Sequence, residues 1–125
     1  MKKNTGITRV LLAFKHSGKG FKFLITQEAA FQQELILAAV LAPLSFVISQ
    51  NLSELLLLLM SLALVLIIEI LNTAIEATVD RVGQEYHELS GLAKDLGSMA
   101  VLVSLLFAAG VWITFLWRYG STAIN

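Results

Sequence analysis

The fold depends on one stretch, Glu69-Ile70-Leu71-Asn72-Thr73-Ala74-Ile75-Glu76-Ala77-Thr78-Val79-Asp80, which continues without a turn signal from a run of Leu, Val and Ile. As a helix, the stretch carries its polar residues on one face, at offsets of three, four, seven and eleven from the first: Glu69, Asn72, Thr73, Glu76 and Asp80. Carboxylates are costly to place at membrane depth, so this face indicates a functional site.

The depth of each carboxylate follows from helix geometry. If the helix begins near Leu52, a hydrocarbon core of about 30 Å takes up roughly 20 residues at about 1.5 Å each. Glu69 then lies just inside one edge of the core, whereas Glu76 and Asp80 lie beyond it, among headgroups and water. A site that joins a lipid hydroxyl to a water-soluble phosphate donor would need this layout.

Composition indicates a single membrane domain over residues 1–125. The chain is 57% hydrophobic and 14% charged, which is too apolar for an ordinary soluble domain. The absence of cysteine excludes disulfides and thiolate chemistry, and two histidines argue against a structural zinc site. Anionic headgroups explain the basic residues before the first apolar block, so no nucleic-acid partner is expected. These residues are Lys2, Lys3, Arg9, Lys15, Lys19 and Lys22.

The apolar pattern predicts an all-α membrane protein with a surface helix and three transmembrane helices. An amphipathic interfacial helix is expected over about 5–25, with Gly18 and Gly20 leaving open two hinged pieces. Transmembrane helices are expected over 29–48, 52–80 and 96–117, the second extending into the cytoplasm. Pro43 is expected to break the first of these helices.

Loop charges orient the bundle. The N-terminus and the 81–95 connection carry Lys or Arg, whereas the 50–54 turn carries neither, so the basic side is expected to be cytoplasmic. A set of ionisable groups then collects at the inner membrane surface: Glu28, Glu69, Glu76, Asp80, Glu85, His87, Lys94 and Asp95. This convergence predicts a site at that surface.

The carboxylates at this surface can divide into two roles. Mg²⁺ characteristically takes one or two carboxylates plus substrate phosphates, which suits acids at the water boundary. The deeper Glu69 suits a general base. Lys94 and Arg9 can hold phosphate oxygens. For Glu28, a helix-capping charge and a metal ligand are equal alternatives.

Two other classes compete with an interfacial site. The same acids can line an ion or proton pathway, or pair with polar groups to hold helices together. Against a pathway, the acids sit at one boundary, and only Glu34 on the first span approaches the interior. Against a purely structural role, so many like charges at one level would repel each other without a cation or phosphate. An interfacial site is therefore favoured.

Three motifs carry a family resemblance: Glu28-Ala29-Ala30-Phe31-Gln32-Gln33-Glu34, the stretch from Glu69 to Arg81, and Glu85-Tyr86-His87-Glu88-Leu89-Ser90-Gly91-Leu92-Ala93-Lys94-Asp95-Leu96-Gly97-Ser98. Together they resemble the small bacterial integral-membrane diacylglycerol kinases over nearly the whole chain. The resemblance implies transfer of phosphate from ATP, with Mg²⁺, to diacylglycerol, giving phosphatidic acid. It also implies a homotrimeric helical bundle in the bacterial inner membrane, with its N-terminus and active site cytoplasmic. Related enzymes of the same fold phosphorylate undecaprenol, which stays an alternative substrate.

The resemblance also assigns roles to residues of this chain. Glu69 resembles the general base, supported by Asn72, and Glu28 and Glu76 resemble metal ligands. The implied nucleotide-binding residues are Arg9, His16, Glu85, Tyr86, His87, Lys94 and Asp95. The implied lipid-side residues are Arg9, Ser17, Glu34, Glu69 and Ser98. Supporting positions are Ala30, Thr73 and Asp80.

Overall fold

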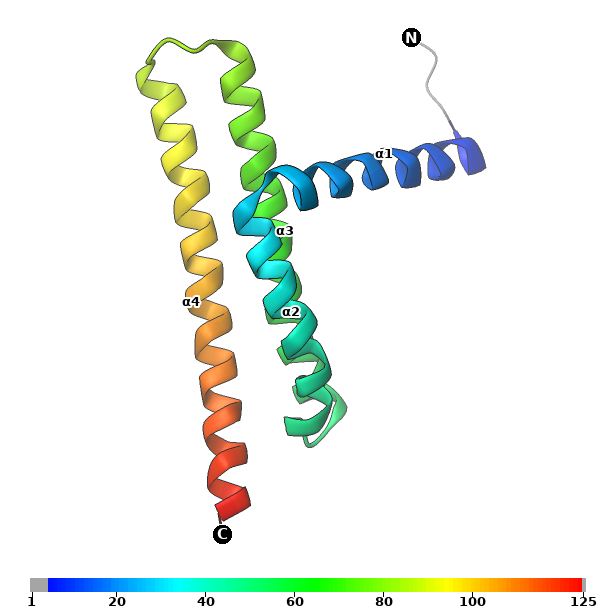
Figure 1. Ribbon diagram of the computed structural model, residues 1–125, viewed down its shortest axis with the longest axis vertical. Helices are drawn as coiled ribbons and strands as arrows, with labels where there is room; N and C mark the ends of the chain where they lie inside the picture. Colours follow the sequence, from blue (N-terminus) through cyan, green and yellow to red (C-terminus); the bar gives the residue numbers. More distant parts are fainter. Residues whose placement is uncertain (1–4, 125) are drawn as a thin grey trace.

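The computed structural model describes residues 5–124 and contains four α-helices in that range: α1 (Gly6–Gln27), α2 (Ala29–Ile48), α3 (Leu52–Val82) and α4 (Glu88–Ile124). No strand occurs among these residues. Helices α2, α3 and α4 are each long and apolar enough to cross a membrane. The predicted class, an all-α protein with one N-terminal helix and three candidate spans, is confirmed. Figure 1 shows α2, α3 and α4 running alongside one another, with α1 extending to one side from the start of α2.

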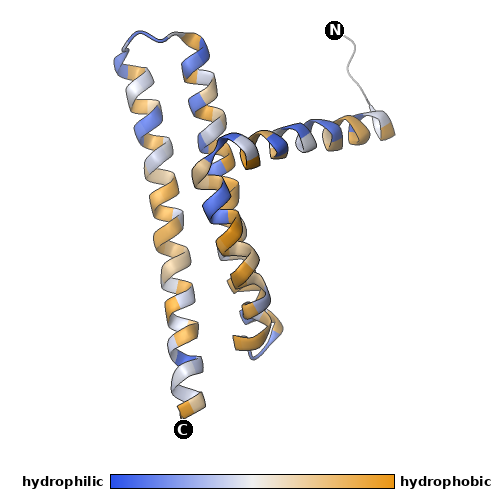
Figure 2. Ribbon diagram, viewed as in Figure 1, coloured by the Kyte–Doolittle hydropathy of each residue, from blue (hydrophilic) through white to orange (hydrophobic). Residues whose placement is uncertain are grey.

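Helix α1 is continuous through Gly18 and Gly20, so the hinged alternative is not observed. It meets α2 at a single extended residue, Glu28, and Gln32 Nε2 bridges the corner by donating to the carbonyl oxygen of Ile25 at 2.8 Å. Phe21 and Phe31 pack edge to face across the same corner. Figure 2 shows apolar and polar residues alternating along α1. Its apolar side chains beyond the corner, such as Phe14, are exposed, as an interfacial helix requires.

The expected break at Pro43 is wrong, because α2 runs as one helix to Ile48. A proline removes one backbone donor, and membrane helices tolerate this when the surrounding helix is otherwise hydrogen-bonded. The Ser45 hydroxyl, two residues after the proline, donates to the carbonyl oxygen of Ala42 at 2.5 Å.

Helices α3 and α4 form the main hairpin of the bundle. The residues buried along α3 are Leu58, Ser61, Val65, Glu69, Asn72 and Thr73, and those buried along α4 are Gly97, Ser104, Ala108 and Trp112. Small residues in such stripes let membrane helices approach closely. Trp112 packs in one apolar cluster with Ile48 and Leu58, so the core lies near the α2–α3 turn.

The α2–α3 turn and the neighbouring part of α4 form what we call the short-turn end. Asn51 Oδ1 accepts from the backbone N–H of Glu54 at 3.0 Å, and Glu54 Oε1 accepts from that of Gln50 at 2.8 Å. Reciprocal bonds of this kind satisfy the free donors at a helix start. Arg118 of α4 binds both carboxylate oxygens of Glu54 and the carbonyl oxygen of Ile48.

The opposite end, which we call the long-loop end, holds the last turns of α3, the connection 83–87 and the start of α4. Helix α4 begins at Glu88, ahead of the expected transmembrane segment 96–117, and His87 Nδ1 accepts from the backbone N–H of Leu89 at 3.1 Å at this start. The 37-residue helix is about 55 Å long at about 1.5 Å per residue, which exceeds a hydrocarbon core of about 30 Å. Figure 2 shows this end as more hydrophilic than the middle of the bundle.

Candidate active site

The acidic face of α3 lies against its neighbours where the three bundle helices meet. Glu69 is 6% exposed, and Asn72 and Thr73 are each 9% exposed. Asn72 Nδ2 donates to Glu76 Oε1 at 3.2 Å, one helical turn along the same face. The expected helical spacing therefore brings an amide and two carboxylates together.

The α1–α2 corner adds two further acids to this face. The carboxylates of Glu28 and Glu34 both lie within electrostatic range of Glu69, as does that of Glu76. Carboxylates from α2, from α3 and from the residue between α1 and α2 thus come within electrostatic range of Glu69, although Glu28 and Glu34 are far from it in sequence. We call Glu28, Glu34, Glu69 and Glu76, with Asn72, the acidic cluster.

Several polar atoms in and beside this cluster are buried and have no hydrogen-bond partner: Glu34 Oε2, Asn72 Oδ1 and Thr73 Oγ1. Buried polar groups in proteins are nearly always paired, so an unpaired set marks a place where a ligand or ion supplies the partner. Oxygen atoms of this kind are the donors that a hard divalent cation takes. The donor chemistry therefore fits Mg²⁺. Within residues 5–124, no group of three or more His, Asp or Glu side chains is arranged to hold a metal ion by itself.

A polar cleft of about 520 Å³ lies at the long-loop end, beyond the acidic cluster on the same face of α3. Its lining residues are Val79, Asp80, Gly83, Gln84, Glu85, Tyr86, His87, Ser90, Gly91 and Lys94. Lys94 Nζ forms an ion pair with Asp80 Oδ1 at 2.6 Å and lies within electrostatic range of Glu76. One cation therefore connects the cleft to the acidic cluster.

This cleft gathers four of the expected nucleotide-binding residues, Glu85, Tyr86, His87 and Lys94. The sequence predicts that the 84–91 connection can hold a base or ribose, without assigning that role to Gln84, Ser90 or Gly91 one by one. The signal available for them was their place in the polar connection between two apolar spans. Gly91 lies under the Tyr86 ring, where an added Cβ would sit 3.6 Å from Tyr86 Cε2.

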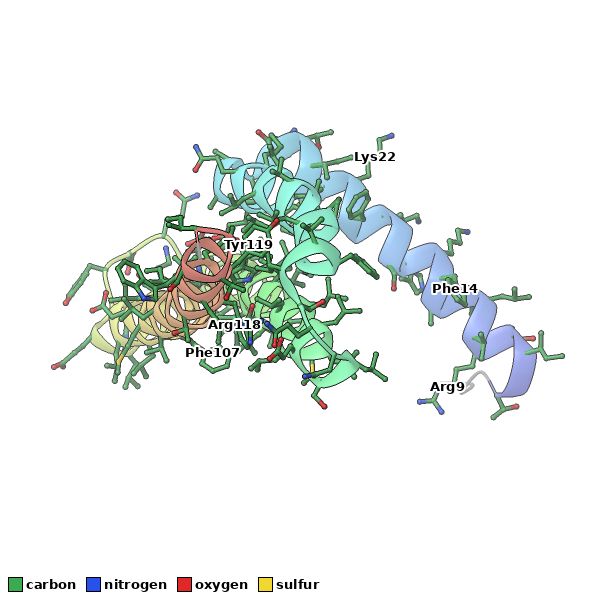
Figure 3. All side chains as sticks on the ribbon, turned by 90° about the horizontal axis from the view of Figure 1, so that it is seen from below. Arg9, Phe14, Lys22, Phe107, Arg118 and Tyr119 are labelled. Atoms are coloured by element: carbon green, nitrogen blue, oxygen red, sulfur yellow. The ribbon has the colours of Figure 1, made fainter. Side chains whose placement is uncertain are left out.

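Other expected site residues lie elsewhere within this chain. Arg9, His16 and Ser17 are exposed on α1, and Arg9 and Ser17 share a shallow groove there. Figure 3 shows Arg9 near the end of α1 that is remote from the bundle. Asp95 and Ser98 are exposed on α4 and do not line the polar cleft, and Ala30 is exposed on α2. Their expected roles stay predictions.

Comparison with known proteins gives a consistent result. A family described as prokaryotic diacylglycerol kinase matches residues 15–116. A diacylglycerol kinase of Escherichia coli (strain K12) is 44% identical over 115 residues, covering 92% of this chain and 94% of the relative. One of Haemophilus influenzae is 43% identical over 112 residues, covering 90% and 95%. One of Helicobacter pylori (strain J99) is 36% identical over 114 residues, covering 91% and 89%.

Proposed function

The chain belongs to the prokaryotic diacylglycerol kinase family, and we propose that it transfers the γ-phosphoryl group of ATP to the free hydroxyl of diacylglycerol, giving phosphatidic acid. The observation that carries the proposal is the continuity between a buried carboxylate, Glu69, and a polar cleft along the same face of α3. A lipid hydroxyl and a water-soluble nucleotide can meet along that face.

Glu69 is the general base of this proposal. Its carboxylate takes the proton of the lipid hydroxyl while the hydroxyl oxygen forms a bond to the γ-phosphorus of ATP. The bond from that phosphorus to the oxygen of the β-phosphate breaks, ADP leaves, and the proton passes later from Glu69 to water. Transfer of this kind depends chiefly on position and charge neutralisation, which the acidic cluster and Lys94 supply.

Glu28 and Glu76 would hold the Mg²⁺. When bound, the ion would neutralise negative charge on the phosphate oxygens of ATP. Asn72 holds one oxygen of Glu76 through its amide, which fixes the direction in which that carboxylate points. Lys94, already in electrostatic range of Glu76, is placed to attract the phosphates into the polar cleft.

The proposal includes a homotrimer in the bacterial inner membrane, with the long-loop end in the cytoplasm. The position of Arg9 supports sharing of sites between chains, because it lies at the end of α1 that points away from its own bundle (Figure 3). Mixing subunits that carry Arg9→Ala with subunits that carry Glu76→Ala tests this. Regained activity is expected, and no regain would mean that each chain completes its own site.

The reaction is tested by phosphate transfer from labelled ATP, with Mg²⁺, in mixed micelles that offer either diacylglycerol or undecaprenol. Turnover of diacylglycerol that Glu76→Ala abolishes is the expected result. Glu88→Gln, which removes an exposed carboxylate that does not line the polar cleft, is the matched control and should keep activity. Preference for undecaprenol would show that the proposed lipid substrate is wrong and would leave the proposed mechanism unchanged. Transfer to neither lipid, by folded protein, would overturn the function.

A further inference from the structure

Gly97 is the one glycine of the described chain that presses against a member of the acidic cluster. A Cβ added at Gly97 would collide with Asn72 Oδ1 and would lie 3.3 Å from Asn72 Cγ and 3.9 Å from Asn72 Cβ. Gly91 meets only the Tyr86 side chain, and the other glycines have nothing within 4 Å of an added Cβ. Buried on α4, Gly97 therefore occupies a place where no side chain fits while Asn72 keeps its present orientation.

The nature of these neighbours matters. All three of the nearest atoms belong to the Asn72 side chain, and none belongs to the backbone of α3. A glycine that served only to bring two helix backbones together would meet backbone atoms first. The space at Gly97 is instead the space that the Asn72 amide occupies.

The Asn72 amide is fixed from two sides. Its Nδ2 donates to Glu76 Oε1 at 3.2 Å, and its Oδ1 is buried against Gly97 without a hydrogen-bond partner. Turning the amide away from α4 would draw Nδ2 away from Glu76. The orientation of the Glu76 carboxylate thus depends on the empty space at position 97.

We propose that Gly97 is a positioning residue, which lets α4 close over Asn72 and so holds the amide that orients Glu76. The inference rests on the proposed function, because Glu76 is assigned there as a ligand of Mg²⁺. Groups that orient a metal ligand typically change metal affinity or activity by about 10- to 100-fold when altered. Gly97 would act indirectly, by fixing the position of Asn72, which in turn orients Glu76.

A double-mutant cycle tests the inference with Gly97→Ala, Asn72→Ala and the combination of both. The probe is Mg²⁺ with β,γ-imido-ATP, whose binding is measured by calorimetry in micelles, together with the unfolding temperature of each variant. We expect Gly97→Ala to weaken binding by about 10-fold or more. In the Asn72→Ala background, Gly97→Ala should change neither binding nor unfolding temperature, because the obstructing side chain is gone.

Gly110→Ala is the matched control, since it adds the same methyl group to the same helix where nothing lies within 4 Å. It should bind and unfold as the wild type does. Gly97→Ala that behaves like Gly110→Ala would overturn the inference. An equal loss of binding and of unfolding temperature for Gly97→Ala in both backgrounds would also overturn it, because position 97 would then act on α3 without Asn72.

If Gly97→Ala does not fold alone, folding restored by Asn72→Ala supports the inference, and continued failure contradicts it. Coupling in the unfolding temperature is measurable even if the wild type phosphorylates no lipid, so the two proposals fail separately.

Discussion

The short-turn end and the acidic cluster handle buried polar groups in opposite ways. At the short-turn end, Arg118 contacts Glu54 through two bonds of 2.6 and 2.8 Å and also donates to the carbonyl oxygen of Ile48. Deeper in the bundle, Trp112 Nε1 donates to the buried Ser61 hydroxyl at 3.0 Å. At the short-turn end an arginine pairs with a carboxylate, and deeper in the bundle a donor of α4 pairs with an acceptor of α3.

In the acidic cluster, by contrast, like charges lie near one another and buried oxygens lack partners. Carboxylates of like charge converge on Glu69, and oxygens of Glu34 and Asn72 are buried without partners. The only side-chain bond within the cluster is the one from Asn72 to Glu76. Such an arrangement costs stability unless a ligand completes it.

The difference separates two tasks in one bundle. The short-turn end holds α2, α3 and α4 in register, and its opposite charges pair within the chain, with Arg118 Nε its one buried side-chain atom left without a partner among the described residues. The acidic cluster is left incomplete, and proteins leave such gaps where a bound group supplies the missing partners. Changes at the short-turn end should therefore alter stability without altering chemistry, and changes in the acidic cluster should do the reverse.

The largest effect is expected for Glu69→Gln. Removing a general base lowers turnover by about 10²- to 10⁴-fold. The unfolding temperature should stay the same or rise, because one of several like charges is gone. Steady-state kinetics and thermal unfolding in the same micelles measure both quantities. Near-wild-type turnover would mean that Glu69 is not the base.

Arg118→Gln should cause the largest loss of stability among single changes at the short-turn end. It leaves the half-buried Glu54 carboxylate without its cation and frees the carbonyl oxygen of Ile48. The unfolding temperature should fall by several degrees, with little change in KM for ATP. Arg81→Gln, which removes an exposed arginine at the end of α3, is the control and should be neutral. An equal fall in unfolding temperature for both variants would show that the Arg118 contacts stabilise the fold no more than an exposed arginine does.

Ser61→Ala should lower the free energy of unfolding by about 1–3 kcal/mol, because it leaves the buried Trp112 N–H unpaired. Ser104→Ala is the matched control, since that buried hydroxyl bonds only to the carbonyl oxygen of Val101 in its own helix. Chemical unfolding in micelles compares the two. If Ser104→Ala lowered the free energy of unfolding as much as Ser61→Ala does, the hydrogen bond between helices would contribute no more to stability than a bond within one helix.

Asn51→Ala should have the smallest effect, about 1 kcal/mol of stability lost with the cap of α3. Ser53→Ala, one residue into the same helix and exposed, controls for the local change. If Asn51→Ala altered turnover more than stability, the short-turn end would not be limited to a structural role, and its contrast with the acidic cluster would fail.

Periodicity and hydropathy predicted the helices and the polar face of α3, because both depend on spacing along one helix. The contact of Arg118 with Glu54 could not be predicted, since it joins residues far apart in sequence through the packing of α4 on the turn. For the same reason the closeness of Gly97 to Asn72 could not be predicted.

Pro43 and the start of α4 show where local rules failed. Pro43 predicts a break in the helix, but the surrounding apolar helix continues through it. The polar residues of 81–95 predict a connection, but the helix begins at Glu88, where His87 Nδ1 accepts from the backbone N–H of Leu89. In both places, context overrode a propensity of one or a few residues.

The most direct test of the comparison is the unfolding temperature with and without Mg²⁺ and β,γ-imido-ATP, measured on the wild type, Ser61→Ala and Glu76→Ala. A ligand at about 100 times its Kd stabilises the folded state by about 2.7 kcal/mol. We expect the wild type and Ser61→Ala to gain equally in unfolding temperature, from different starting points, and Glu76→Ala to gain nothing. The same gain in Glu76→Ala as in the wild type would contradict the view that the acidic cluster is completed by this ligand.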